Sequence, residues 1–503
     1  MPIPFFNSIA SWILKKRIHQ IELFMKYPNE VQRELLSDLI DFCKRTEIGL
    51  KNEFSTIKNY DDFKKRLPII TYDDLEPKIN KCREGVKNIL WPTPIKWFAK
   101  SSGTTNSKSK FIPVSLESLE DCHYKGGKDM LSLYFNNNPN SNLLSGKCLR
   151  LGGSQEIYQK GDTYFGDLSA IIIDNLPIWA QFSSTPSQKT SLIPIWEKKI
   201  KGIIDESLNE NVTSLAGVPS WMLVLLNKIL KDTGKKNIFE IWPEIEVYFH
   251  GGINFDPYKN QYNELLNSNK FKYYEIYNAS EGFFAIQDIN HSNELLLMLD
   301  YGIFYEFIPI NSKKEDYESI IPLSEVDLGI KYEIVITTNG GLWRYRIGDV
   351  VIFTNIKPYR IILSGRTKNF INAFGEELMM NNAEKAISAA SSKVNVKVID
   401  YTVAPIYMKK NIKGTHEWFI EFEKPPTNMK NFIRILDSAL KDENSDYEAK
   451  RHRDITMIEP KVNIVPKNTF YRWLESNNKL GGQHKIPRLS NNRDFVEDLI
   501  KLI

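Results

Sequence analysis

The run Glu246-Val-Tyr-Phe-His250 predicts a buried strand, and Lys272-Tyr-Tyr-Glu-Ile-Tyr277 predicts the next; each ends at a glycine or a polar turn. Helical patterns precede them at residues 195–208 and 219–230, the second of which is strongly apolar. Strands that alternate with helices favour an α/β architecture, with residues for chemistry at the strand ends. The sequence therefore predicts an α/β fold and directs the search for functional residues to these turns.

The pattern changes on both sides of this region. Upstream, residues 12–50 have a helical period, and residues 149–153 and 170–173 are predicted as strands. Downstream, apolar runs without intervening helices between residues 296 and 354 predict antiparallel sheet. Beyond Gly365 the pattern is that of a compact α+β unit. We therefore predict two domains, residues 1–365 and 366–503.

The composition indicates a globular protein with several domains. The chain has 503 residues, more than one hydrophobic core usually organises, and 42% of them are hydrophobic. The charge of +4 comes from 66 basic and 62 acidic residues, a balance too even to indicate a nucleic acid or membrane partner. No apolar stretch reaches the roughly 18 residues of a transmembrane helix. Four widely spaced cysteines argue against a zinc site or a disulfide framework and favour a cytoplasmic location.

Residues 100–113 read Lys-Ser-Ser-Gly-Thr-Thr-Asn-Ser-Lys-Ser-Lys-Phe-Ile-Pro, a hydroxyl-rich stretch with one glycine and three lysines. Backbone N–H groups in a tight turn form an anion-binding concavity, to which hydroxyls add donors and lysines add positive charge. The stretch predicts a phosphate-binding loop, although ordinary loops share this composition. A Walker-type fold is disfavoured, because its pattern needs two glycines and a lysine directly before Ser or Thr.

A second motif, Tyr277-Asn-Ala-Ser-Glu-Gly282, follows one of the predicted strands. The strand delivers Tyr277, whose ring can stack on adenine, and the turn presents Ser280 and Glu281 close enough for the same ligand. The Glu281 carboxylate suits Mg²⁺. The alternative is a capped turn in which Glu281 faces water.

A third motif, Arg344-Tyr-Arg-Ile-Gly-Asp349, places two guanidinium groups, a phenol and a carboxylate between apolar strands, where an unpaired charge is costly. Asp349 suits ribose hydroxyls. The alternatives are a structural Arg–Asp pair and a hairpin turn at Gly348-Asp349. The turn is expected instead at Asn339-Gly340-Gly341, which leaves Asp349 available for a ligand.

Two further candidates and two basic runs complete the pattern. His250 is a catalytic candidate with a structural histidine as its alternative, and Lys485, in a basic loop at residues 481–488, can reach a phosphate or belong to a solvated tail. The runs Lys15-Lys-Arg-Ile-His19 and Lys450-Arg-His-Arg453 are interpreted as solvated helix faces, because acidic residues lie nearby.

Taken together, the motifs resemble the plant-type acyl-acid amido synthetases, the auxin-responsive family within the firefly-luciferase-like acyl-adenylating superfamily. The matched patterns are a Ser-Ser-Gly-Thr loop at 101–113, Tyr-x-x-Ser-Glu-Gly at 277–282 and Tyr-Arg-x-Gly-Asp at 345–349. Phe374-Gly-Glu-Glu-Leu378 and Gln483-His-Lys-Ile-Pro-Arg488 extend the resemblance over nearly the whole chain. The chain is shorter than the plant enzymes and has Phe-Gly-Glu-Glu at residues 374–377, and in both respects it looks more like bacterial relatives.

The resemblance implies a large N-terminal α/β domain and a small mobile C-terminal α+β domain that closes over it. It implies that ATP and Mg²⁺ are used to adenylate a small carboxylic acid, and that the acyl group then passes to the amine of an amino acid, giving an amide, AMP and pyrophosphate. Two rivals remain: a thioester-forming acyl-CoA ligase that uses the same adenylate, and a non-catalytic ATP-binding scaffold. Neither a nucleic acid nor a membrane is expected as partner, and no oligomeric state is predicted.

The resemblance also implies roles for individual residues. Lys485 and Ser280 are the implied catalytic residues, near the developing charge and the α-phosphate. Glu281 is the implied Mg²⁺ ligand, and Asp349 is the implied partner of the ribose hydroxyls. The other implied nucleotide contacts are Ser101, Ser102, Gly103, Thr104, Thr105, Tyr277, Tyr345 and Arg366.

Overall fold

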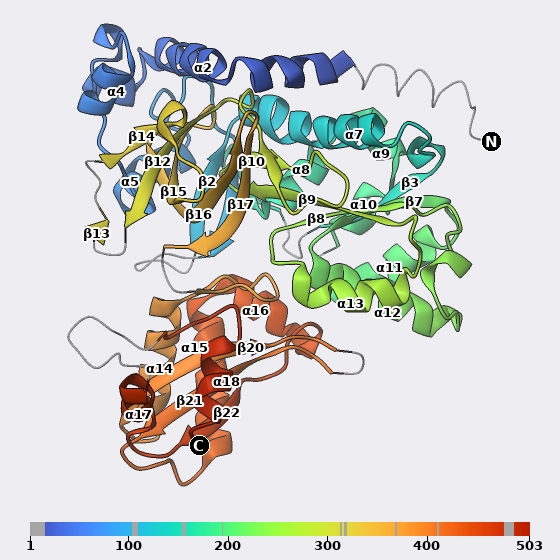
Figure 1. The fold of residues 1–503 in the computed structure, drawn as a ribbon, viewed down its shortest axis with the longest axis vertical. Helices are drawn as coiled ribbons and strands as arrows, with labels where there is room; N and C mark the ends of the chain where they lie inside the picture. The colour runs from blue at the N-terminus through green and yellow to red at the C-terminus, as the bar shows by residue number, and fades with distance from the viewer. Residues whose placement is uncertain are drawn as a thin grey trace.

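The structure is a computed structural model that describes residues 16–102, 109–152, 157–193, 195–311, 314–315, 319–367, 370–409, 412–476 and 487–503. Figure 1 shows a large N-terminal part built on a twisted sheet, with a smaller C-terminal part beneath it. The predicted α/β fold class, with a small C-terminal α+β unit, is confirmed.

The main sheet joins a parallel half to an antiparallel half. The parallel half runs in the order β9 (Lys272–Ala279), β8 (Val247–Gly251), β7 (Val212–Gly217), β3 (Lys147–Leu151) and β6 (Ser184–Thr185). The antiparallel half continues from β9 through β10 (Gly282–Ile286), β11 (Leu295–Leu297), β17 (Tyr359–Arg366), β16 (Tyr345–Ile356), β15 (Lys331–Thr338) and β12 (Ile303–Asn311), with β13 (Lys314–Glu315) and β14 (Ile321–Pro322) beside β12. The antiparallel sheet predicted between residues 296 and 354 is thus confirmed.

The parallel half is buried because helices cover both of its faces. Successive side chains of a strand point to opposite faces, and β8 shows both contacts. Its Tyr248 stacks on Tyr262 of α13 (Asp256–Leu265), with ring centroids 5.1 Å apart, while Phe249 meets Tyr134 of α7 (Lys125–Asn137) at 5.6 Å. Strands buried on both faces read as continuous apolar runs, which is why the sequence indicated them clearly.

The other helices of the N-terminal part frame this sheet. The two helices predicted at 195–208 and 219–230 are confirmed as α11 (Trp196–Ser207) and α12 (Pro219–Thr233), and the helical opening is confirmed over residues 16–26, 28–43 and 47–51. The remaining helices are α2 (Pro28–Cys43), α3 (Glu47–Lys51), α4 (Tyr60–Arg66), α5 (Tyr72–Arg83), α6 (Leu116–Ser118), α9 (Ile178–Phe182) and α10 (Gln188–Ser191).

The strand predicted at residues 170–173 is wrong, because this segment forms α8 (Leu168–Asp174). The run Ala-Ile-Ile-Ile has high strand propensity, but a short apolar run cannot be told from a buried helix by its pattern. Packing decides the outcome here, since Ala170, Ile171 and Ile173 are all buried on the helix. Strand-like propensity was overridden by tertiary contacts.

A four-stranded sheet lies beside the main one. Its order is β2 (Ser109–Val114), β1 (Trp97–Ser102), β5 (Thr163–Gly166) and β4 (Tyr158–Lys160). The predicted phosphate-binding stretch therefore begins as β1 and ends as β2. The residues between them, 103–108, lie outside the described ranges.

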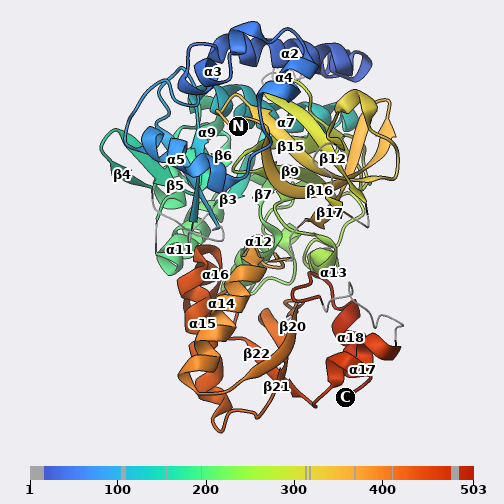
Figure 2. The ribbon, with the colours of Figure 1, turned by 90° about the vertical axis from the view of Figure 1, so that its left-hand side faces the viewer.

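The C-terminal part has a three-stranded sheet of β20 (Val398–Ile406), β21 (Thr415–Phe422) and β22 (Lys461–Val465), preceded by the pair β18 (Phe370–Ile371) and β19 (Leu378–Met379). Its helices are α14 (Met380–Lys393), α15 (Met429–Glu443), α16 (Ser445–Arg451), α17 (Thr469–Ser476) and α18 (Asp494–Ile500). In Figure 2, α16 stands at the edge of this part that faces α12.

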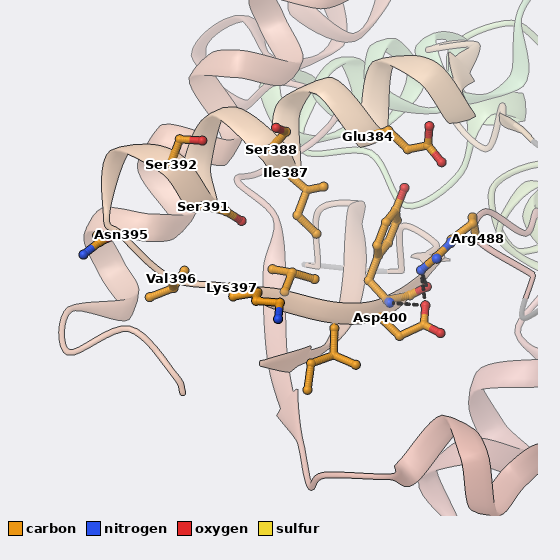
Figure 3. A pocket seen from close by; sticks show the side chains of 13 residues that line it. Glu384, Ile387, Ser388, Ser391, Ser392, Asn395, Val396, Lys397, Asp400 and Arg488 are labelled. Atoms are coloured by element: carbon orange, nitrogen blue, oxygen red, sulfur yellow. Dashed lines mark hydrogen bonds and ion pairs between the residues drawn. The ribbon is translucent and has the colours of Figure 1, made fainter. Parts of the chain in front are cut away.

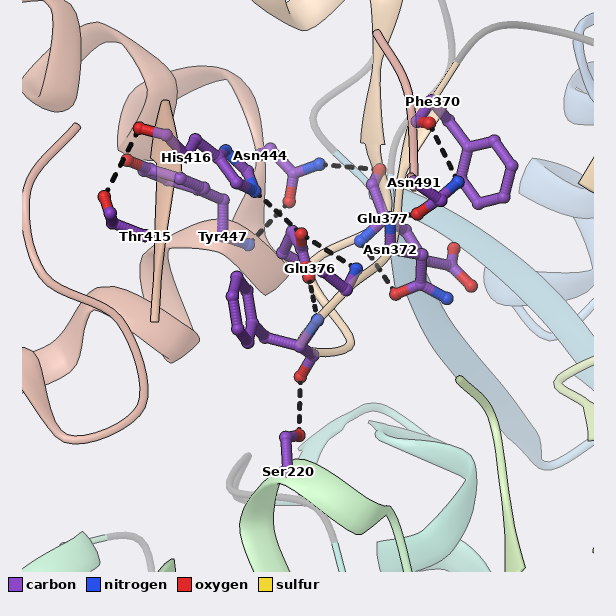
Figure 4. Close-up of polar contacts among 12 residues, drawn as sticks. Ser220, Phe370, Asn372, Glu376, Glu377, Thr415, His416, Asn444, Tyr447 and Asn491 are labelled. Carbon is purple, nitrogen blue, oxygen red and sulfur yellow. Dashed lines mark hydrogen bonds and ion pairs between the residues drawn. The ribbon is translucent and has the colours of Figure 1, made fainter. Parts of the chain in front are cut away.

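Loop 372–377 joins the two parts through buried contacts. The Tyr258 hydroxyl of α13 donates to the Ala373 carbonyl at 2.5 Å, and the Ser220 hydroxyl of α12 donates to the Phe374 carbonyl at 2.9 Å. Glu376 sits inside the loop, where it accepts the Phe374 N–H at 2.6 Å and pairs with the fully buried His416 at 2.7 Å (Figure 4). The loop is therefore held from both sides where the two parts meet.

Candidate active site

A cavity of about 940 Å³ lies between the N-terminal sheets and the C-terminal part. Its wall includes Lys100 and Ser101 of the first motif, Tyr277 to Glu281 of the second, and Asp349 of the third. Strand ends build this wall, since β1, β8, β9 and β17 all end at it. Three motifs far apart along the chain thus meet at one cavity, as the sequence predicted.

The second motif reaches the cavity as a tight hairpin. Ala279 at the end of β9 pairs with Gly282 at the start of β10, so Ser280 and Glu281 form the two-residue tip. Both line the cavity. Burial raises the pKa of Glu281 above its ordinary value, while the nearby cations Lys110 and Arg366 act against that rise. The alternative of a turn with Glu281 in open water is therefore not what the structure has.

Tyr277, Asp349 and Arg366 form one hydrogen-bonded chain in the cavity wall. The Tyr277 hydroxyl donates to Asp349 Oδ2 at 2.6 Å, and Arg366 Nε donates to Asp349 Oδ1 at 2.6 Å. Strand register explains the second contact, because Asp349 of β16 is paired with Arg366 of β17. The guanidinium of Arg366 also lies 3.7 Å from Glu377. Arg366, which was predicted from the resemblance alone, therefore binds Asp349, the residue predicted to contact the ribose hydroxyls.

Tyr277 and Tyr345, the tyrosines of the second and third motifs, have rings that pack mainly in the core. Tyr277 is only 6% exposed and packs on Phe284 with centroids 4.8 Å apart. Tyr345 is fully buried and is not among the residues that line the cavity. The structure therefore places Tyr345 behind the wall, whereas the sequence placed it with the nucleotide contacts. Adenine stacking by Tyr277 stays a prediction.

The two arginines of the third motif pair with glutamates of β12 and β15. Arg344 binds Glu306 of β12 at 2.8 Å, and Arg346 approaches Glu333 of β15 at 2.5 Å. The hairpin turn does fall at residues 339–341, between β15 and β16, as predicted. The motif thus divides into structural arginines and an aspartate that lines the cavity.

Several predicted residues lie outside the described ranges: Gly103, Thr104, Thr105 and Lys485. Ser101 lines the cavity, and Ser102 is the last residue of β1, paired in register with Ser109 of β2. Contacts of the loop with phosphates, and of Lys485 with the reacting groups, stay predictions.

The interpretation of the two basic runs as solvated faces is wrong for three of their residues. Arg17 binds the buried carboxylate of Asp129 at 2.8 Å. Arg451 is 6% exposed and binds Asp437 at 2.7 Å, while Lys450 lines the cavity. The charge pattern along the chain did not reveal these roles, because Asp129 and Asp437 come from other helices, α7 and α15.

The sequence also missed cavity residues from both domains. Besides Lys450, these are Asp167 at the start of α8, Glu377 in loop 372–377 and Asp446 on α16. The one available signal was Phe374-Gly-Glu-Glu-Leu378, in which Glu377 belongs to a segment that the resemblance singled out.

His250 of β8 is a buried histidine at the cavity edge, 3% exposed and stacked on Phe255 with centroids 4.1 Å apart. Burial, with a smaller contribution from Lys259, lowers its pKa from 6.5 to about 3. The folded protein therefore keeps His250 neutral at pH values where the unfolded chain binds a proton there. Acidification through this interval favours unfolding by up to about 1.4 kcal/mol per pH unit.

We expect His250→Gln to weaken the acid sensitivity of stability, because a glutamine binds no proton in the unfolded chain. Unfolding midpoints measured from about pH 7 down to about pH 4 should fall less steeply for this variant than for the parent. The stability of the variant should still fall somewhat with acidification, because burial also lowers the pKa of His123, to about 4. His19→Gln is the control, since that side chain is 83% exposed. Equal slopes for parent and His250→Gln would contradict this account.

A second hollow of about 540 Å³ lies on the C-terminal part, between α14 and β20 (Figure 3). It contains none of the predicted site residues. Its Arg488 binds Asp400 and lies 4.6 Å above the ring of Tyr401, which accounts for this cation structurally. The 940 Å³ cavity is therefore the candidate active site.

Two other kinds of site, a membrane span and a metal cluster, are absent from the described ranges. Within the described ranges, no helix combines the length and apolar character that a membrane span requires. Within the same ranges, no cluster of three or more His, Cys, Asp or Glu side chains has the arrangement of a metal site. A lone carboxylate such as Glu281 remains suited to Mg²⁺, which usually takes one or two carboxylates together with substrate phosphates.

Comparisons with known proteins match the chain along most of its length. The N-terminal domain of the GH3 family matches residues 17–271, its central domain residues 296–366 and its C-terminal domain residues 381–494. Jasmonoyl-L-amino acid synthetase JAR4 of Nicotiana attenuata is 25% identical over 94% of this chain and 92% of its own. The probable indole-3-acetic acid-amido synthetase GH3.1 of Arabidopsis thaliana is 23% identical over 96% and 92%.

Solved structures share the fold. The GH3.15 acyl acid amido synthetase superposes with a TM-score of 0.62 at 17% identity, covering 97% of this chain and 96% of its own. A 2-hydroxyisobutyryl-CoA ligase, in complex with 2-HIB-AMP and CoA, gives 0.54 at 12% identity, covering 95% and 92%. The resemblance inferred from the three motifs is confirmed by these matches along the sequence and in the fold: the chain belongs to the GH3 family.

Proposed function

We propose that this protein is an ATP-dependent ligase that joins a carboxylic acid to an amino acid. In the first half-reaction, a carboxylate oxygen of the acid attacks the α-phosphorus of ATP, and pyrophosphate leaves. In the second, the amine nitrogen attacks the carbonyl carbon of the acyl-adenylate, the bond from that carbon to the AMP oxygen breaks, and the nitrogen loses its proton. The products are an amide, AMP and pyrophosphate.

One observation supports this proposal most directly. Ser101, Glu281 and Asp349 come from three separate motifs, yet all line the cavity between the large and the small domain. A cavity with hydroxyls, a carboxylate for a cation and a carboxylate for ribose has the groups that ATP needs. Had these residues lain on separate surfaces, the motifs would not describe one nucleotide site.

The chemistry needs positioning and charge stabilisation more than covalent help from the protein. A free carboxylate is a poor electrophile because its charge is delocalised, and an acyl-adenylate solves this with AMP as the leaving group. Charge develops on phosphate oxygens, so preorganised donors and cations lower the barrier. Lys100 and Lys110 line the cavity near these positions and supply positive charge.

We assign the residue roles accordingly. Ser280 faces the α-phosphate, Asp349 the ribose hydroxyls with Arg366 beside it, and Lys485 the charge that develops as the domains close. When bound through Glu281, Mg²⁺ supplies positive charge to the phosphate oxygens. Tyr277, which lines the cavity, is the proposed aromatic contact of the nucleotide, with the buried Tyr345 behind it in the wall. The proposed phosphate loop is Ser101, Ser102, Gly103, Thr104 and Thr105. A boundary between residues 365 and 366 and a cytoplasmic location remain predictions.

A pyrophosphate-release screen tests the proposal. The protein is given ATP, Mg²⁺ and one carboxylic acid at a time, aromatic or fatty, and then each amino acid or coenzyme A is added as acceptor. We expect acid-dependent pyrophosphate release and an amide product with an amino acid. Turnover driven by coenzyme A alone would assign the thioester reaction instead. No pyrophosphate with any acid would leave only an ATP-binding scaffold.

A further inference from the structure

Lys450 of α16 lies in the cavity wall, although none of the three motifs contains it. Its ammonium nitrogen is 4.6 Å from the centroid of the Trp221 ring on α12. The lysine therefore reaches across from the C-terminal part to the N-terminal part and presents a positive charge where the two domains meet.

Loop 372–377 leaves space for this lysine. A Cβ atom at position 375 would stand only 3.1 Å from Lys450 Cε and 3.2 Å from its Nζ. Gly375 also has φ +91°, a conformation that suits glycine. The bare backbone at Gly375 thus lets the Lys450 side chain lie along the cavity wall instead of being displaced from it.

The helix that carries Lys450 is held in place at its start. Asn444, just before α16, accepts the Tyr447 N–H at 2.8 Å and donates to the Glu377 carbonyl at 3.1 Å (Figure 4). The hydroxyls of Ser445 and Ser109 are 3.3 Å apart, which links α16 to β2 of the N-terminal part. Lys450 is therefore on a positioned element, not on a mobile surface helix.

Carboxylates accompany Lys450 in the same part of the wall. Asp446 lies one helical turn before it on α16, and Asp167 of the N-terminal part also lines the cavity. Burial and the nearby carboxylates of Glu377 and Asp167 raise the pKa of Asp446, while Lys450 opposes this rise. The wall thus offers Lys450, with Lys100 of the N-terminal part nearby, beside carboxylates at a place where both domains contribute.

This pattern matches one substrate of the proposed reaction. An amino acid carries a carboxylate and an ammonium group on the same carbon, so its recognition needs a cation and an anion a few ångströms apart. ATP and the acyl acid carry no ammonium group, and the carboxylates proposed for Mg²⁺ and for ribose are Glu281 and Asp349. Asp446 and Asp167 are further carboxylates, which suit the amino group of the acceptor. Val218, beside Gly375 and Gly252, adds an apolar surface for a side chain.

We propose that Lys450 binds the α-carboxylate of the acceptor amino acid, with Asp446 and Asp167 facing its amino group. This inference rests on the proposed amide-forming function and adds to it the site of the second substrate. Because α16 belongs to the C-terminal part, the acceptor site would be complete only when the two domains are together.

The test compares acceptors with and without a carboxylate, using Lys450→Met, which keeps side-chain length and removes the charge. For the best amino acid of the screen, we expect KM to rise by about 10- to 100-fold, the loss expected for a charged hydrogen-bonded contact. KM for the corresponding amino acid amide should change less than about threefold. Lys450→Arg should recover most of the loss, and Lys430→Met, at an exposed position on α15, should change nothing.

The first half-reaction separates this inference from the function on which it rests. Acid-dependent pyrophosphate release, and hydroxamate formation with hydroxylamine as a carboxylate-free acceptor, should be unchanged in Lys450→Met. An equal rise in KM for the amino acid and its amide, or an unchanged KM for both, would overturn the assignment of Lys450 while leaving the ligase intact. A parent protein without pyrophosphate release would overturn both.

Discussion

Glu281→Gln is expected to lower the rate of acid-dependent pyrophosphate release by about 100- to 1000-fold. The glutamine keeps the shape of the hairpin tip at Ser280-Glu281, but it removes the carboxylate that lines the cavity. A carboxylate contributes most to Mg²⁺ binding through its charge, which an amide lacks. The loss should therefore appear in pyrophosphate release at every amino acid concentration.

Two readouts distinguish lost chemistry from lost structure. The concentration of Mg²⁺ that gives half-maximal rate should rise in Glu281→Gln, whereas the unfolding midpoint should not fall. Glu264→Gln, at an exposed position on α13, is the matched control and should behave like the parent. A Glu281→Gln protein with the parent's rate and Mg²⁺ dependence would refute the role of this carboxylate.

Arg344→Met should lower the free energy of unfolding by about 3–5 kcal/mol, because it strands a buried charge. Arg344 and Glu306 have side chains only 3% and 1% exposed and are joined by two hydrogen bonds of 2.8 and 2.9 Å. The guanidinium also donates to the carbonyls of Lys64 and Leu67. All of these acceptors lose their donor in the variant.

A second substitution tests the mechanism of this loss. Adding Glu306→Gln to Arg344→Met removes the stranded carboxylate, while the amide oxygen can still accept the Tyr60 hydroxyl that now lies 2.9 Å from Glu306. The double variant should therefore be more stable than Arg344→Met in urea or thermal unfolding. Arg33→Met, at an exposed position on α2, should change stability by less than about 0.5 kcal/mol. If Arg344→Met is equally harmless, the pair does not hold the strands together.

Residues of the same motif have different roles: some line the cavity and others stabilise the sheet. Glu281 and Asp349 line the cavity, whereas Arg344, Arg346 and Tyr345 of the same conspicuous segment support the sheet. A short motif indicates that polar residues lie at or between strands. Which of its side chains faces a ligand depends on strand register and on residues from other strands.

The sequence by itself determined the α/β class, the antiparallel region, the small C-terminal unit and the family likeness. These follow from periodicity and short motifs, which are local properties of the chain. The strand predicted at residues 170–173 shows the limit, because burial of Ala170, Ile171 and Ile173 selected a helix there.

Only the tertiary structure decided how the charged residues pair. Asp349 meets Arg366 through strand pairing, Arg344 meets Glu306 across the sheet, and Lys450 reaches a cavity that two domains enclose. The physical reason is that a buried charge needs a partner, and in a folded chain that partner comes from whichever element packs against it. Sequence neighbours do not reveal that element, so a run such as Lys450-Arg-His-Arg453 looks solvated until the fold brings its partners to it.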